Sequence, residues 1–175
     1  MGESAFIVTV QEAEDLVGRF RREFDPTALL GVPAHISVLF PFMDPAFIDE
    51  SVRSEAGRVL AAIPSFAFSL SRFDRFPDLI YLVPDATTEF VELTQALVAA
   101  FPEYPPYGGR FEKIIPHLTV AHGSEADLAA VVRQLADAMS ATGPINAVCH
   151  SVLLIENSSG VWRTMHTFPL ADASL

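Results

Sequence analysis

The stretch PHLTVAH at residues 116–122 decides how the rest of the chain folds, because AHISVLF at residues 34–40 repeats its pattern. Each stretch contains a histidine, an apolar residue, a hydroxyl residue and a second apolar residue. Side chains alternate between the two faces of a strand, so His35 and Ser37 share one face, as do His117 and Thr119. The apolar residues face the opposite side, where they can anchor each strand in a core. We therefore expect a fold that brings the two histidine–hydroxyl pairs together.

Strand and helix patterns surround these stretches in the same order. Strand, helix, histidine strand, helix and strand occur twice in succession, with apolar residues at helical spacing in each helix. Asp44 followed by Pro45 is typical of a helix start, and so is Ser124. In helix 11–24 the helical spacing places Arg21 on the polar side. The predicted elements are strand 5–10, helix 11–24, strand 35–40, helix 44–63, strand 66–73, strand 79–83, helix 87–101, strand 116–122, helix 124–143, strand 145–156 and strand 161–168.

The duplication predicts two-fold pseudo-symmetry. His35 and His117 lie almost half a chain length apart, and no linker composition separates the two repeats. A chain of 175 residues is long enough to bury one sizeable core. We therefore predict that residues 1–175 form a single domain of two pseudo-symmetric lobes with a cleft between them.

The charge of the chain limits its partners. The net charge is −11, from 22 acidic and 11 basic residues. Long nucleic acids are bound mainly by neutralising their phosphates, which requires an excess of Lys and Arg. We therefore expect no long nucleic-acid groove, whereas a small anionic ligand or an RNA end can still be bound by a few local donors.

The composition also predicts where the chain resides. Cys149 is the only cysteine, so an intrachain disulfide and a cysteine-based zinc site are both impossible. The N-terminal residues lack the apolar core of a signal peptide. The most apolar run, residues 28–43, is interrupted by prolines and is too short to span a bilayer. We expect a cytoplasmic protein with no membrane partner.

The paired motifs contain the groups needed for acid–base chemistry at phosphorus. Free histidine titrates near pH 6.5, so one imidazole can act as the base and the other as the acid, each contributing roughly 10² to 10⁴ in rate. The hydroxyls of Ser37 and Thr119 can donate hydrogen bonds to a phosphate between the rings. The scheme needs no metal and no cofactor, and the sequence contains no P-loop, HExxH, EF-hand or Gly-x-Ser-x-Gly motif.

HISV at 35–38 and HLTV at 117–120, with the duplication around them, resemble the two-histidine (2H) phosphoesterase superfamily, in its 2′-5′ RNA ligase or cyclic phosphodiesterase-like branch. The resemblance covers essentially the whole chain. It implies a bilobed α+β fold with antiparallel sheets flanking a central cleft. It also implies metal-independent hydrolysis of 2′,3′-cyclic or 2′-5′-linked phosphodiesters of small nucleotides or RNA ends. By analogy His117 is the base and His35 the acid, a choice that the residues alone leave open.

Three further residues are candidate substrate contacts. The family often has Arg or Tyr five residues after the second motif histidine, and here that position is His122. Strict alternation turns His122 away from His117 unless the strand bulges. Tyr107 and Arg110 lie in or just after the Pro/Gly-rich loop that precedes the second motif. This loop can equally be a simple connection with no role in binding.

Two other functions remain open. The same cleft can serve as a non-catalytic binding module for a nucleotide or another phosphorylated ligand. It can also join RNA ends as a 2′-5′ RNA ligase, although the negative charge disfavours a dedicated RNA enzyme. The base preference, the product isomer and the oligomeric state are not determined by the sequence.

Overall fold

The computed structural model describes residues 2–172, so the outermost residues of the predicted domain, 1 and 173–175, lie outside the described part. Its strands are β1 (Ser4–Thr9), β2 (His35–Leu39), β3 (Phe66–Phe76), β4 (Leu79–Pro84), β5 (Leu118–His122), β6 (Ile145–Cys149), β7 (Ser151–Glu156) and β8 (Arg163–Pro169). Its α-helices are α1 (Glu14–Phe24), α2 (Pro26–Leu29), α3 (Glu50–Leu60), α4 (Thr87–Ala100) and α5 (Glu125–Thr142). Short 3₁₀ turns lie at Gln11–Ala13, Pro45–Phe47 and Pro106–Gly109.

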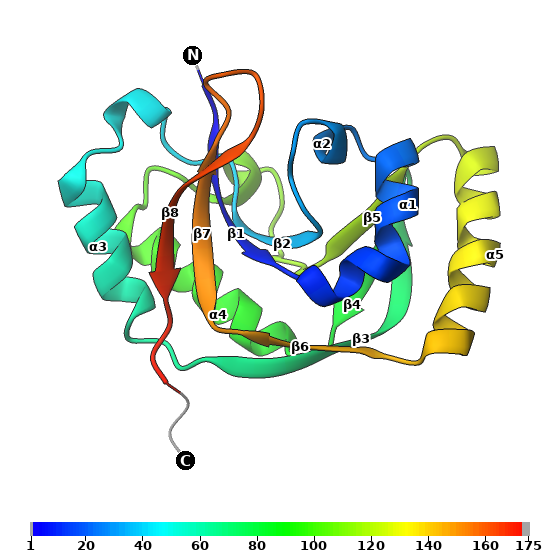
Figure 1. The fold of residues 1–175 in the computed structure, drawn as a ribbon. Helices are drawn as coiled ribbons and strands as arrows, with labels where there is room; N and C mark the ends of the chain where they lie inside the picture. Colours follow the sequence, from blue (N-terminus) through cyan, green and yellow to red (C-terminus); the bar gives the residue numbers. More distant parts are fainter. Residues whose placement is uncertain (1, 173–175) are drawn as a thin grey trace.

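The eight strands form one antiparallel sheet in the order β6-β3-β4-β5-β2-β1-β7-β8 (Figure 1). It has two halves, β6-β3-β4-β5 and β2-β1-β7-β8. A single residue pair, Ile36 with Leu118, joins them where β2 meets β5. The predicted α+β fold with antiparallel strands is confirmed, and the two expected sheets are the halves of one continuous sheet.

The helices are exchanged between the two halves of the sheet. The chain runs β1-α1-β2-α3-β3 and then β4-α4-β5-α5-β6, as the repeat predicts. Nevertheless α1 packs on β5 and α4 packs on β2, so each repeat covers the histidine strand of the other (Figure 1). Ile36 and Leu118 are fully buried in the core that these helices complete, which leaves the opposite face of both strands to the histidines. Among residues 2–172, no helix has the length and apolar composition needed to cross a membrane.

The start of α3 differs from the prediction. Asp44 caps only the 3₁₀ turn Pro45–Phe47, and Asp49 caps α3 through its hydrogen bond from the Val52 backbone N–H. Between them Ile48 leaves the helical region, at ψ 89°, and its side chain is buried. The single helix predicted from Asp44 onward is therefore wrong. The capping prediction at Ser124 is confirmed, because Ser124 and Asp127 form a reciprocal capping box at the start of α5.

The predicted strand 145–156 is in fact two strands. It is broken at His150, where β6 ends and β7 begins. The break is needed because β6 pairs with β3 in one half of the sheet, whereas β7 pairs with β1 and β8 in the other half. Strand β3 is also longer than predicted, since it extends beyond Phe73 to Phe76 to pair with β4.

Candidate active site

The two histidine motifs lie next to each other at the centre of the sheet. In an antiparallel pair, matching Ile36 with Leu118 places His35 across from Thr119 and Ser37 across from His117. The side chains of these four site residues are all half-buried, whereas Ile36 and Leu118 are fully buried on the other face. The structure thus brings both predicted histidine–hydroxyl pairs to one face, in a crossed arrangement.

Each motif strand carries a bulge directly after its hydroxyl residue. The pairing of β2 with β1 skips Val38, and the pairing of β5 with β4 skips Val120, which is the equivalent position. The Val38 carbonyl accepts a hydrogen bond of 2.8 Å from the buried Thr94 hydroxyl of α4. An extra residue in a strand reverses the alternation of the side chains that follow it.

The bulge returns His122 to the face that carries Thr119. Val120 and Ala121 between them are both buried, whereas Thr119 and His122 are half-buried. The nearby His122 contributes to lowering the pKa of His117. The strand therefore has the bulge that allows His122 to lie beside the site. The equivalent position in the first motif is occupied by Phe40.

Both imidazole rings are held by the same backbone hydrogen bond. The Nδ1 atom of His35 donates to the Pro33 carbonyl at 2.8 Å, and the Nδ1 atom of His117 donates to the Ile115 carbonyl at 2.6 Å. A carbonyl oxygen can only accept, so Nδ1 carries the proton in each neutral ring. This fixes the same tautomer twice and leaves Nε2 as the atom that can exchange a proton with a ligand.

Burial keeps both rings uncharged near neutral pH. It lowers the pKa of His35 to about 4, with a further decrease from Arg21 and His117 and an increase from the Pro33 hydrogen bond and Asp25. Burial also lowers the pKa of His117, against an increase from its hydrogen bond to Ile115. The protein's own groups therefore leave neither imidazole protonated at pH 7. An anion placed between the rings would raise the pKa of both.

We expect the burial of His35 to make stability depend on pH. The unfolded ring takes up a proton near pH 6.5 and the folded ring only near pH 4. The stabilisation is therefore complete above pH 6.5 and is lost as the pH falls to 4, by at most about 3 kcal/mol. Urea unfolding at pH 7 and pH 4 measures the loss. The loss of stability between pH 7 and pH 4 should be smaller in His35→Asn than in the wild type. In His150→Asn, which alters an exposed histidine, the loss should equal that of the wild type. An equal loss in His35→Asn and wild type would refute the expectation.

A cavity of about 450 Å³ adjoins His117. The ring centroid of His117 lies 5.6 Å from that of Phe76 and 5.3 Å from that of Tyr81, in both cases edge to face. Phe76, Tyr107 and Phe111 line the cavity, together with one cation, Lys113, and one acidic residue, Asp78. Such a cavity suits a flat organic group.

Tyr107 and Arg110 lie in different surroundings. Tyr107 lines the cavity next to His117 and shares a second, small gap with Ser37. Its backbone is left-handed, at φ 52°, and its N–H donates to the Phe40 carbonyl at 2.6 Å. Burial raises the pKa of its phenol, which therefore stays a neutral donor. Arg110 is exposed and is not among the residues that line this cavity, whereas Lys113 is.

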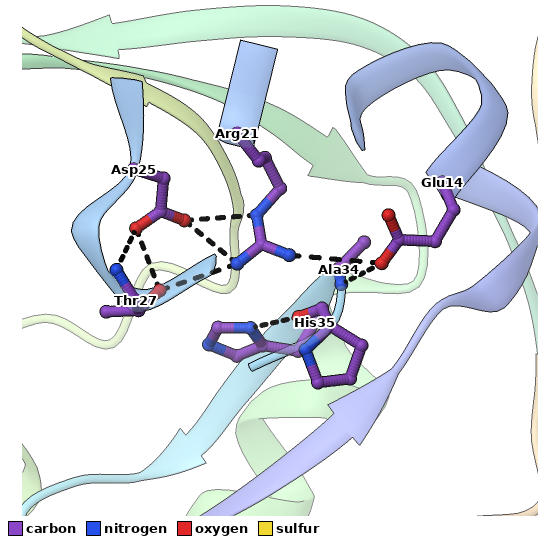
Figure 2. Close-up of polar contacts among 7 residues, drawn as sticks. Glu14, Arg21, Asp25, Thr27, Ala34 and His35 are labelled. Carbon is purple, nitrogen blue, oxygen red and sulfur yellow. Dashed lines mark hydrogen bonds and ion pairs between the residues drawn. The ribbon is translucent and has the colours of Figure 1, made fainter. Parts of the chain in front are cut away.

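A buried polar network lies behind His35 and is not evident from the sequence. Arg21 is 2% exposed, although helical spacing placed it on the polar side of α1. Its guanidinium binds Asp25 at 3.0 and 2.9 Å and lies 4.0 Å from Glu14 (Figure 2). The Arg–Asp pair four residues apart was the available sequence signal. Phe76 was missed because the alternating pattern of β3 ends three residues earlier.

Nothing in the arrangement around the histidines has the form of a metal site. Across residues 2–172, no group of three or more His, Cys, Asp and Glu side chains is placed to hold a metal ion. The polar groups that converge are instead imidazoles and hydroxyls, which bind an anion by hydrogen bonds.

Two matched imidazole–hydroxyl pairs on one face of a duplicated antiparallel sheet define a two-histidine α+β protein. The sequence profile of the 2′-5′ RNA ligase superfamily matches residues 9–160, a span that contains both motifs. The chain belongs to the 2′-5′ RNA ligase superfamily, as the paired motifs predicted.

Solved structures share this fold at low sequence identity. The protein TT0787 of Thermus thermophilus superimposes with a TM-score of 0.64 at 14% identity, over 98% of this chain and 100% of that one. LigT of E. coli, complexed with 3′-AMP, gives a TM-score of 0.60 at 13% identity, over 96% and 97%. At these identities the likeness establishes the fold alone. No curated protein sequence matches the chain significantly.

Proposed function

We propose that the protein is a metal-independent phosphodiesterase that hydrolyses small 2′,3′-cyclic or 2′-5′-linked phosphodiesters of nucleotides or RNA ends. The observation that supports the proposal is the crossed pairing of β2 with β5, from which two imidazoles and two hydroxyls lie in neighbouring positions on one face of the sheet. Four such groups suit a tetrahedral anion. Structures of E. coli LigT, which shares the fold, have been solved with phosphate and with 3′-AMP.

The proposed reaction is an in-line displacement at phosphorus. Nε2 of one imidazole removes a proton from water, whose oxygen attacks the phosphorus. The bond from phosphorus to the leaving oxygen breaks, and Nε2 of the other imidazole gives that oxygen a proton. The family analogy assigns the base to His117 and the acid to His35. Ser37 and Thr119 donate hydrogen bonds to the non-bridging oxygens, where negative charge accumulates in the transition state.

The substrate itself generates the acid in this scheme. Burial lowers the pKa of both rings, so neither is charged before a ligand binds. A phosphodiester carries one negative charge, which favours protonation of an adjacent imidazole. Binding of the substrate and uptake of a proton are therefore coupled.

The cavity next to His117 provides a place for the organic part of the substrate. Its aromatic side chains, Phe76 and Phe111, offer faces on which a base can stack. Tyr107 and His122 remain proposed substrate contacts, and Lys113 is a cation in the lining of this cavity. Arg110 stays a predicted contact that the fold does not bring into this cavity.

A non-catalytic nucleotide-binding module is the second candidate. It is favoured by the lowered pKa of both histidines, which leaves the site without a resident acid at pH 7. A 2′-5′ RNA ligase is the third, and the net charge of −11 weighs against a long RNA substrate.

Turnover in the presence of EDTA tests the proposal. We expect 2′,3′-cyclic nucleotides to be converted to nucleoside monophosphates, with the same rate before and after EDTA, as followed by ³¹P NMR. Loss of activity with EDTA would contradict metal independence. Calorimetric binding without product over long incubation would favour the binding module, and joining of RNA fragments would favour the ligase.

A further inference from the structure

The peptide group between Pro33 and Ala34 links a carboxylate to the ring of His35 (Figure 2). Its N–H donates to Oε1 of Glu14 at 2.5 Å, and its carbonyl accepts from Nδ1 of His35 at 2.8 Å. The two hydrogen bonds lie on opposite ends of the same amide and polarise it in the same direction. Glu14 in α1 therefore acts on His35 through one peptide, although the two side chains are not hydrogen-bonded to each other.

The second repeat has no such link. Nδ1 of His117 donates to the Ile115 carbonyl, so the equivalent peptide joins Ile115 to Pro116. Proline has no N–H, so the Ile115–Pro116 peptide cannot donate a hydrogen bond to a carboxylate as the Pro33–Ala34 peptide does. Both imidazoles donate from Nδ1 to a backbone carbonyl. Only in the case of His35 does the N–H of the same peptide donate to a carboxylate. One residue in each motif, Ala34 or Pro116, makes this difference.

The charged and titratable groups around His35 come from three parts of the chain. Glu14 and Arg21 lie on α1, Asp25 caps α2, and His117 precedes β5. Arg21 is bound on both sides, by Asp25 at 2.9 Å and by Glu14 at 4.0 Å. This pairing keeps the Glu14 carboxylate, whose side chain is 29% exposed, next to the Ala34 N–H.

We propose that Glu14 is a positioning residue for His35: through the Pro33–Ala34 peptide it holds the Nδ1–H tautomer and stabilises the protonated ring. This support offsets part of the desolvation that lowers the pKa of His35. The inference rests on the proposed function, in which one imidazole must bring a proton to the leaving group. It gives the protonated form of His35 a support that His117 lacks.

The test uses Glu14→Gln, whose amide oxygen still accepts from the Ala34 N–H while the negative charge is gone. The matched control is Glu23→Gln, an exposed carboxylate on the same helix. Imidazole ¹⁵N shifts are followed against pH in the whole protein saturated with inorganic phosphate. In Glu14→Gln the midpoint of His35 should fall by about half a pH unit, with that of His117 unchanged.

Kinetics give a second measurement. We expect Glu14→Gln to lower kcat for a 2′,3′-cyclic nucleotide about three- to tenfold with KM within about twofold. Glu23→Gln should alter neither. If His35 titrates identically in Glu14→Gln and in the wild type, the inference is overturned. The NMR titration needs no turnover, so an inactive protein with the expected His35 shift would contradict the proposed function and leave the role of Glu14 intact.

Discussion

His35→Ala and His117→Ala are each expected to lower kcat/KM for a 2′,3′-cyclic nucleotide by about 10³-fold or more. Each imidazole transfers one proton in the proposed reaction, and such a transfer contributes roughly 10² to 10⁴ in rate. The double variant should lose little more than either single variant, because groups that act as a unit are not additive. Initial rates with a cyclic nucleotide in EDTA measure all three.

The control for this loss is His150→Ala, which removes an exposed imidazole at the break between β6 and β7. Its rate should match that of the wild type. Both site variants should remain folded, because each removes a ring that burial holds in its neutral form rather than a charged partner. A loss of less than tenfold in His35→Ala or His117→Ala would mean that this ring transfers no proton.

Local periodicity was enough to predict the duplicated fold. The apolar stripes of α4 and α5 and the capping residue Ser124 determine those helices from within their own sequence. Period-two alternation likewise placed His35 with Ser37 and His117 with Thr119. These features depend on residues no more than a few positions apart, which is why the sequence reveals them.

The features that the sequence did not reveal depend on distant partners. No local residue marks the bulges at Val38 and Val120, because each valine is followed by another apolar residue of its strand. They exist because β1 and β4 set the register of the neighbouring strands. The face of His122 follows from the second bulge. For the same reason the break at His150 follows from a change of strand partner rather than from a turn residue.

The burial of Arg21 is a further case in which contacts with a distant part of the fold outweigh the local sequence pattern. Helical spacing predicts the polar side of α1 for this residue, but the loop that contains α2 and leads to Pro33 covers it. Asp25 ends α1 and then caps α2, so the same side chain that redirects the chain also neutralises Arg21. A pattern within α1 cannot show that the next segment folds back over it.

Asp25→Ala is expected to lower the free energy of unfolding by about 3–5 kcal/mol, because it leaves the guanidinium of Arg21 buried without its closest partner. The side chains of Arg21 and Asp25 are only 2% and 1% exposed. Asp25 also accepts hydrogen bonds from the backbone N–H and the hydroxyl of Thr27, at 3.0 and 2.8 Å, so its loss removes the cap of α2 as well. Urea unfolding at pH 7 measures the change.

The matched control is Glu55→Ala, which breaks the pair between Glu55 and Arg58 on the surface of α3. That pair has similar geometry, with contacts of 2.9 and 2.6 Å, but both side chains reach the solvent. Water and salt screen an exposed pair, so the unfolding midpoint of Glu55→Ala should equal that of the wild type. Equal midpoints for Asp25→Ala and Glu55→Ala would show that solvent reaches Arg21. The ion pair between Arg21 and Asp25 would then not hold the loop before His35 in place. The proposed link from Glu14 through the Pro33–Ala34 peptide to His35 would lose one of the contacts that position it.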